Sequence, residues 1–314
     1  MTKLSVIIPA YNAEKTIERT IRSVMASTIP VDVWVVDDGS TDGTAALADR
    51  LAESCNPTIQ QSNNPTILHV IHQPNSGAYQ ARLNALKRIT TPYFGFVDAD
   101  DTVEPRMFER MVAACETNNL DCVQCGIMRV GEMSGSGTMV DKSLNSTVPL
   151  NSPTPTSITA PTQKVLEGES LERHKFHYLV DTREGCFIWD KLYRNQYDFS
   201  AFDPTDRVTN FDDMIFNLQF FLKVGRMGFL NEPLYHYATT DGSAVHSFSE
   251  KTLKDFREIC RVRRELLPRY GVDPDGAANR AWFRRNRMNC IRSAIRAGNL
   301  TWAQKISIVW RLMR

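Results

Sequence analysis

Two aspartates separated by one small residue, Asp98-Ala-Asp100, have the type and spacing that metal chemistry requires. They follow a short apolar run that ends at Val97. Side chains two positions apart on a strand project to the same side of a sheet. Two carboxylates on one side suit Mg²⁺ or Mn²⁺, and either ion can bridge a diphosphate. The pair therefore predicts a site for a divalent cation and a phosphorylated ligand.

Three further polar clusters follow apolar runs in the first third of the chain. They are Pro9-Ala-Tyr11-Asn12, Asp37-Asp38 and Gln73-Pro-Asn75-Ser-Gly77. Segments with helical spacing of apolar residues lie between the runs, at Ala13–Ser27, Thr41–Leu51 and Ala78–Arg88. Such alternation predicts an α/β fold with a doubly wound, mixed but mostly parallel sheet flanked by helices. Because the carboxyl ends of parallel strands form the ligand crevice, the clusters are expected to meet at one site.

Several classes of protein are disfavoured by what the sequence lacks. A GxGxxG sequence is missing after the first apolar run, so NAD binding is not expected. Seven cysteines without regular spacing predict neither a disulfide framework nor a zinc site. No apolar run reaches the roughly 18 residues of a membrane-spanning helix. The N-terminus lacks a signal-peptide pattern, so cytoplasmic placement is expected.

The charge is unevenly distributed along the chain. The formal net charge is +1, but residues 254–314 hold 15 Lys/Arg and 5 Asp/Glu, a net charge of +10. The preceding residues therefore carry −9, and no acidic residue follows Asp275. A near-neutral total disfavours a nucleic-acid-binding protein, and no base-reading motif accompanies the basic segment.

The basic segment has helical spacing of apolar residues. One face would hold Leu253, Phe256, Ile259, Val262, Leu266 and Leu267, and a second helix would continue with Trp282, Met288, Ile291 and Ile295. A capping-box pattern, Thr301-Trp-Ala-Gln304, predicts a last helix with Trp302, Ile306, Val309, Trp310 and Met313 on one side. The fold is thus expected to end in a helical C-terminal appendage. Helices are also expected at 168–180 and 212–223, and a strand at 227–230.

Ordered motifs along residues 3–245 carry a family resemblance. The N-terminal ones are Ser5-Val-Ile-Ile-Pro-Ala-Tyr-Asn12, Val36-Asp-Asp-Gly-Ser-Thr-Asp42, Asn75-Ser-Gly77 with Ala81-Arg82, and Phe96-Val-Asp-Ala-Asp100. The later ones are Trp189-Asp-Lys-Leu-Tyr-Arg194, Phe211-Asp-Asp213 and Glu232-Pro-Leu-Tyr-His-Tyr237. Together they resemble glycosyltransferase family 2, the inverting enzymes with the GT-A fold. The resemblance implies metal-assisted transfer of a hexosyl or N-acetylhexosaminyl group from a UDP-sugar in cell-surface polysaccharide synthesis.

The resemblance also implies roles in binding the donor. Pro9, Tyr11 and Asn12 would line the base and ribose site, and Asp38 would accept a hydrogen bond from the N3–H of uracil. Arg82 would assist nucleotide or diphosphate binding. The ligands of Mn²⁺ or Mg²⁺ would be Asp100, Asp98 and a histidine after the Glu232-Pro-Leu-Tyr segment, either His236 or His246.

On the acceptor side, the resemblance implies a general base at the start of a helix. Asp213 is assigned as that base, beside Asp212, which replaces the commoner Glu. Adjacent like charges would raise one of the two pKa values. Without the resemblance, this pair would be interpreted as helix N-terminal carboxylates. Trp189 and Lys191 are expected in the acceptor site, where Trp189 would stack on a sugar ring.

The predicted organisation has four parts. Residues 1–130 would form the nucleotide-sugar-binding half, 131–164 a flexible Gly/Ser/Thr/Pro-rich loop, and 165–250 the acceptor-binding half. Residues 251–314 would form a basic amphipathic tail that contacts an anionic membrane surface, packs on the catalytic domain or docks a second subunit in a homo-oligomer. The acceptor would be a glycan or a polyprenyl-linked molecule, and no nucleic-acid partner is expected. Two other functions remain open, a nucleotidyltransferase and a non-catalytic nucleotide-sugar-binding protein.

Overall fold

The computed structural model describes residues 3–55, 66–130, 164–177, 179, 187–199, 211–238 and 250–313. They belong to two compact units. The sheet unit takes in Met1–Leu171, Ile188–Asp203 and Val224–Thr240, and the helical unit takes in Glu172–Phe187, Pro204–Lys223 and Asp241–Arg314. The predicted loop 131–164 lies outside the described residues except for its last position. The division at 130, 164 and 250 stays a prediction.

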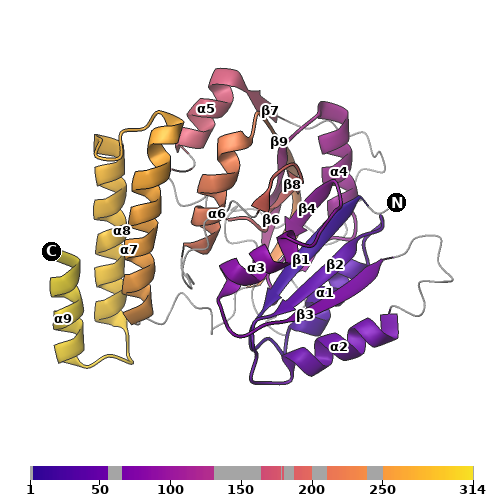
Figure 1. Ribbon diagram of the computed structural model, residues 1–314, viewed down its shortest axis with the longest axis horizontal. Helices are drawn as coiled ribbons and strands as arrows, with labels where there is room; N and C mark the ends of the chain where they lie inside the picture. The colour runs from indigo at the N-terminus through magenta and orange to yellow at the C-terminus, as the bar shows by residue number, and fades with distance from the viewer. Residues whose placement is uncertain are drawn as a thin grey trace. The chain divides into compact units, whose positions relative to one another are not determined.

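The first half of the sheet is parallel, as predicted. Strands β1 (Leu4–Ala10), β2 (Asp32–Asp37), β3 (Ile67–His72) and β4 (Tyr93–Phe96) lie in the order β3-β2-β1-β4. Helices α1 (Ile17–Met25), α2 (Thr44–Cys55) and α3 (Ala78–Leu86) connect them (Figure 1). Every residue of β1 is buried, which explains its continuous apolar run. The carboxyl ends of the four strands therefore lie along one edge of the sheet.

The second half of the sheet is mixed. It contains β5 (Thr102–Val103), β6 (Cys122–Val130), β7 (Lys164–Glu167), β8 (Lys191–Arg194) and β9 (Arg226–Ala238). Strand β8 lies between β4 and β6 and is antiparallel to both. Strand β6 continues to β9 in parallel, and β9 pairs with β5 and β7 in antiparallel fashion. Within the described residues these strands and β1–β4 form one nine-stranded sheet. In the chain, α4 (Met107–Asn118) lies between β5 and β6, and α5 (Gly168–Phe176) follows β7.

The helical unit contains the predicted C-terminal helices. They are α7 (Glu250–Leu266), α8 (Ala277–Arg296) and α9 (Trp302–Met313), preceded in the chain by α6 (Asp212–Phe220). Figure 1 shows α7, α8 and α9 side by side. The capping box is formed: the Thr301 N–H donates to Gln304 Oε1 at 2.8 Å, and the Gln304 N–H donates to Thr301 Oγ1 at 3.3 Å.

Burial corrects one sequence prediction about these helices. The predicted inner face of α7 is buried, as are Trp282 and Ile291 on α8. Met288 and Ile295 are exposed, so the common face predicted for the four α8 residues is wrong for these two. The four positions do not share one face of a straight helix: at about 100° per residue, Met288, Ile291 and Ile295 lie about 120°, 180° and 140° around the helix from Trp282.

An ion pair ties α4 to β9. The guanidinium of Arg110, buried on α4, donates from Nη2 to Glu232 Oε1 at 2.5 Å and from Nε to Oε2 at 3.1 Å. Glu232 is one-quarter exposed. Removing one partner of a buried pair is more costly than removing both, because the remaining charge is left without compensation.

We therefore expect Glu232→Ala to destabilise the protein by about 3 kcal/mol and the double variant Arg110→Met/Glu232→Ala to recover part of this loss. Glu116→Ala is the matched control, because its pair with Lys3 is about half exposed on both sides and should contribute under about 0.5 kcal/mol. Thermal and urea unfolding would measure all three. A double variant less stable than Glu232→Ala would contradict the prediction.

Candidate active site

Asn12 joins the ends of β1 and β2. Its backbone N–H donates to Ser40 Oγ at 3.0 Å, and its side-chain Oδ1 accepts from the Thr41 N–H at 2.8 Å. Asn12 has a φ of 51°, a left-handed conformation that asparagine tolerates better than most residues. Beside it, Tyr11 is 51% exposed, whereas Pro9 is buried within β1. Tyr11 is thus the predicted base-site residue whose ring is open to a ligand.

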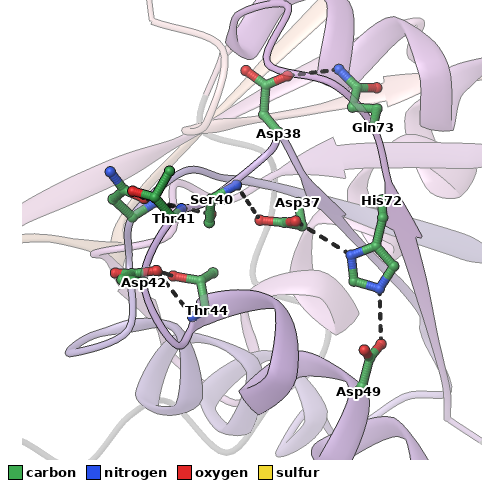
Figure 2. A network of polar contacts seen from close by, with 10 residues as sticks. Asp37, Asp38, Ser40, Thr41, Asp42, Thr44, Asp49, His72 and Gln73 are labelled. Carbon is green, nitrogen blue, oxygen red and sulfur yellow. Dashed lines mark hydrogen bonds and ion pairs between the residues drawn. The ribbon is translucent and has the colours of Figure 1, made fainter.

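Asp38 joins the end of β2 to the start of α3. Its Oδ1 accepts from Gln73 Nε2 at 2.8 Å, as Figure 2 shows. The same oxygen accepts from the Ser76 N–H at 2.7 Å, and Oδ2 accepts from the Gly77 N–H at 2.7 Å. The side chain is buried. A carboxylate has about four acceptor positions, so three donors leave one for a further partner. The contact of Asp38 with uracil stays a prediction. In addition, the structure shows that Asp38 positions the segment at the start of α3.

Two neighbours complete this junction. Asn84 of α3 donates from Nδ2 to Gln73 Oε1 at 2.7 Å, which fixes the amide that serves Asp38. Gly39 has a φ of 71°, and a Cβ there would lie 2.8 Å from the backbone nitrogen of Asn75. Both the backbone conformation and the close approach therefore require glycine in the turn after Asp38.

His72 bridges two carboxylates at the end of β3. Nδ1 lies 3.3 Å from Asp37 Oδ2 and Nε2 lies 3.0 Å from Asp49 Oδ1, as Figure 2 shows. Burial acts to lower the pKa of His72, but the hydrogen bonds and charges of Asp49 and Asp37 outweigh it and raise the pKa. Both ring nitrogens donate only in the protonated ring. This arrangement therefore favours histidinium, and it was not predicted from the sequence.

Asp98 and Asp100 follow β4 and have different environments. Arg82, buried on α3, donates from Nη2 to Asp98 Oδ1 at 2.8 Å, so the predicted diphosphate-binding cation is paired with the predicted metal ligand. Among the described residues, no cationic side chain pairs directly with the Asp100 carboxylate. Burial raises the pKa of Asp100, and the charge of Asp98 adds to this rise. Arg19 donates to the backbone carbonyl of Asp100 at 2.7 Å, and its charge offsets this rise only in part.

The next residue, Asp101, connects this loop to β9. Tyr235 donates its hydroxyl to Asp101 Oδ2 at 2.6 Å and accepts from the Asp98 N–H at 3.1 Å, and the Ala238 N–H donates to Asp101 Oδ1 at 2.7 Å. Burial, with a smaller contribution from the Asp98 charge, raises the pKa of Asp101 to about 8. Asp101 was part of the polar cluster in the sequence, but only the position of β9 reveals that it fixes the backbone of the aspartate pair.

The residues after β4 fit a divalent cation that shares its ligands with a substrate. Mg²⁺ is commonly held by one or two carboxylates, with water and substrate phosphates completing its shell. The partly exposed carboxylates of Asp98 and Asp100 are such a set. In the described part of the chain, no three His, Cys, Asp and Glu side chains group as a metal site. The predicted trio with His236 is therefore not assembled here, since His236 Nε2 lies 3.0 Å from Glu104 Oε1. His246 lies outside the described residues.

The two predicted acceptor-site residues are interior. Trp189 is 3% exposed and stacks on Tyr235 and Tyr237, with ring centroids 4.4 and 5.4 Å apart. The ammonium of Lys191 lies 2.5 Å from Asp190 Oδ1, and both side chains are fully buried. Neither Trp189 nor Lys191 offers a surface to a sugar in this conformation. Their contact with an acceptor stays a prediction that requires the Trp189 ring to be uncovered.

The predicted base, Asp213, lies with Asp212 in the first turn of α6, in the helical unit. The helix dipole favours negative charge at this end. The same turn is anchored by Arg263, a fully buried residue of α7 that contacts Met214 Sδ at 3.7 Å and donates to the carbonyl of Leu179 at 2.7 Å. Met214, the residue after Asp213, is thus fixed by contact with Arg263. This contact suits a helix turn whose carboxylate must be positioned.

Comparison with known families decides the classification. Residues 5–177 match the family model described as glycosyl transferase family 2. The chain belongs to glycosyltransferase family 2. The resemblance stated from the sequence motifs is therefore confirmed.

Relatives and solved structures agree with this family. The glycosyltransferase EpsJ of Bacillus subtilis is 31% identical over 76% of this chain, which spans 62% of EpsJ. Staphylococcus aureus TarS with UDP-GlcNAc superimposes with a TM-score of 0.57 at 19% identity, covering 99% of this chain and 72% of that one. A Pyrobaculum calidifontis mannosyltransferase with GDP-Man and Mn²⁺ gives 0.54 at 15% identity, covering 99% and 80%. These structures show the shared fold, so the predicted GT-A architecture with its C-terminal helices is confirmed.

Across the described segments, no helix combines the length and the apolar character needed to cross a bilayer.

The His72 bridge generates a pH prediction for this family member. Because the folded-state pKa is raised, the bridge should stabilise the protein below the ordinary histidine pKa and lose its effect as pH rises through the folded-state value. We expect His72→Gln to cost about 0.5 kcal/mol near pH 5, since the side chain is half exposed, and almost nothing near pH 8. Thermal unfolding across this range measures the difference. His177→Gln, at an exposed position, is the control, and a gap that widens with pH would refute the bridge.

Proposed function

We propose that this chain is an inverting glycosyltransferase that moves a hexosyl or N-acetylhexosaminyl group from a UDP-sugar to a hydroxyl group of a glycan or lipid-linked acceptor. The observation that carries the proposal is the single edge at which Asp38, Asp98 and Asp100 follow parallel strands, with Asp38 and Asp98 tied together through α3. Family membership supports the reaction class. The UDP-GlcNAc bound to TarS supports the donor class.

For the donor, the exposed ring of Tyr11 offers a stacking surface for uracil, and the remaining acceptor position of Asp38 suits its N3–H. Arg82 would share its guanidinium between Asp98 and the diphosphate. A planar cation with five donors can serve both partners at once. Asp38 cannot swing away to meet the base, because three hydrogen bonds hold it. The base would therefore bind to a preorganised carboxylate.

Asp100 and Asp98 would hold a Mn²⁺ or Mg²⁺ ion together with the donor diphosphate. The fit rests on two partly exposed carboxylates and on the pKa of Asp100, which burial and the charge of Asp98 raise. The Mn²⁺ ion in the structure of the archaeal mannosyltransferase supports this choice. Such an ion supplies charge neutralisation for the departing nucleoside diphosphate, an effect of several kcal/mol or about a thousandfold in rate.

Asp213 would act as the general base. It takes the proton of the acceptor hydroxyl, whose oxygen forms a bond to the anomeric carbon as the bond from that carbon to the diphosphate oxygen breaks. The electron pair of the broken bond leaves with UDP, and the configuration at the anomeric carbon inverts. A carboxylate at the start of α6 stays ionised readily, because the helix dipole stabilises its charge. The adjacent negative charge of Asp212 would act in the opposite direction and favour proton uptake by Asp213.

The biological product would be a cell-surface polysaccharide or a related glycan. TarS, 24% identical over 83% of this chain, is a poly(ribitol-phosphate) β-N-acetylglucosaminyltransferase, which supports a polymeric acceptor. The acceptor contacts of Trp189 and Lys191 and a metal contact of His236 belong to the same proposal. A peripheral location at the inner face of the cell membrane would suit a lipid-linked acceptor.

The base assignment predicts unequal effects of two adjacent substitutions. Asp213→Asn should lower kcat for sugar transfer about a thousandfold while leaving the Kd for UDP unchanged, because the amide keeps the shape but takes no proton. Asp212→Asn is the matched control and should keep kcat within about tenfold. The limb of the kcat–pH profile on the acidic side should vanish in Asp213→Asn alone. Transfer that survives in Asp213→Asn would refute this base, and a wild-type chain that binds no nucleotide sugar would refute the enzyme.

The cation assignment predicts metal dependence at one carboxylate. EDTA should abolish transfer, and added Mn²⁺ should restore it. Calorimetry should show that the wild type binds UDP more tightly with Mn²⁺ than without it. In Asp100→Asn, Mn²⁺ should no longer tighten UDP binding, and kcat should fall about a thousandfold. Glu53→Gln, at an exposed position on α2, removes one negative charge elsewhere and should keep both properties. Full activity in EDTA would contradict the assignment.

A further inference from the structure

Helix α9 presents an apolar stripe to solvent. Trp302, Ile306 and Trp310 are spaced four residues apart and are 74%, 67% and 55% exposed. Residues at this spacing lie on one face of a helix. Two other apolar residues, Ile308 and Leu312, are buried and account for the packing of α9 on its neighbours. The exposed stripe is thus additional to the face that holds the helix in place. Trp282 of α8 is buried and does not belong to the stripe.

Positive charge is abundant in the same part of the chain. Beyond Asp275 the sequence has nine Lys/Arg and no Asp or Glu. The exposed cations on α8 are Arg280, Arg284, Arg285, Arg292 and Arg296. Lys305 connects charge and stripe directly: its ammonium lies 5.3 Å from the ring centre of Trp302 and donates to the carbonyl of Ile295 at 2.8 Å. The exposed side chain of Ile295 therefore lies close to the start of the stripe.

We propose that α9 binds the surface of an anionic lipid bilayer, with its axis along the membrane plane. Tryptophan rings are favoured at the headgroup level, where their apolar bodies and polar N–H groups are both satisfied. The arginines of α8 and Lys305 would meet lipid phosphates. At about 18 Å the helix is too short to cross the hydrocarbon core, so an interfacial position is the one that buries the stripe.

Charge distinguishes this partner from a second copy of the chain. Beyond Asp275 the chain has no acidic residue that could pair with the basic residues of a second copy. Two copies that met through α9 would therefore bring like charges together, and their repulsion would oppose the contact. An anionic bilayer has the opposite charge and an apolar layer beneath it. This membrane contact extends beyond sugar transfer, and it would hold the enzyme where lipid-linked acceptors are present.

The test is flotation of the full chain with vesicles of phosphatidylcholine alone or of an equimolar mixture with phosphatidylglycerol. The wild type should float with the mixed vesicles but not with vesicles of phosphatidylcholine alone, and high salt should release it from the mixed vesicles. Emission from the exposed tryptophans should shift to the blue on binding. Trp302→Gln/Trp310→Gln should lower partitioning at least tenfold and abolish the shift. Because both side chains are exposed, its thermal unfolding midpoint should match that of the wild type.

A charge-matched pair of variants tests the electrostatic part. Arg292→Gln/Arg296→Gln should weaken partitioning about twenty-fold, from about fivefold for each cation near the surface. Arg50→Gln/Lys87→Gln, at exposed positions of the sheet unit, changes the net charge equally and should partition like the wild type.

Three results would overturn the proposal. The first two are a wild-type protein that does not bind the mixed vesicles, and a Trp302→Gln/Trp310→Gln variant that binds them as tightly as the wild type. The third is a wild-type protein that sediments as a dimer and becomes a monomer in Trp302→Gln/Trp310→Gln. Hydrolysis of a UDP-sugar in the absence of vesicles is measured in parallel. The proposed enzyme activity and the membrane contact can therefore fail separately.

Discussion

The arrangement of the site depends on the hydrogen bonds of the buried Asp38 carboxylate. By accepting from the Ser76 and Gly77 N–H groups, it satisfies donors at the start of α3 that the helix itself leaves without partners. The direction of α3 in turn determines where Arg82 reaches Asp98. Three strand ends are thus held by one residue and one helix. A preorganised site of this kind does not spend binding free energy on ordering its own loops when a nucleotide binds.

Carboxylates dominate this edge of the sheet, and the fold treats each one differently. Asp98 is paired with a cation, and Asp101 is buried under a tyrosine hydroxyl and a backbone N–H. Asp100 is left without a paired cation among the described residues. Like charges at close range oppose ionisation. Because Asp98 and Asp101 have partners inside the fold, the repulsion acts mainly at Asp100, where binding of an external cation relieves it most. Sequence alone shows three similar aspartates, and the difference arises from their neighbours.

The parallel half of the sheet was predictable because its strands are buried on both faces, which leaves continuous apolar runs such as Leu4–Ala10. Strand β8 was not recognised, because its four residues include a lysine whose charge is neutralised by Asp190 inside the fold. The bridge from His72 to Asp49 was also invisible, since 23 residues separate the two. For the tail, periodicity identified the helices, but the spacing of Trp302 and Trp310 does not tell which face of α9 is covered.

The position of β8 between β4 and β6 has a consequence for folding during synthesis. β4 is complete at Phe96, yet its neighbour on that side, β8, begins at Lys191. A growing chain therefore has an unpaired β4 edge for roughly ninety-five residues of elongation. The same delay applies to β6, whose partners β8 and β9 both come later in the chain. Closing such distant pairs is slow, so the parallel half is expected to form first and to serve as the template on which the mixed half assembles.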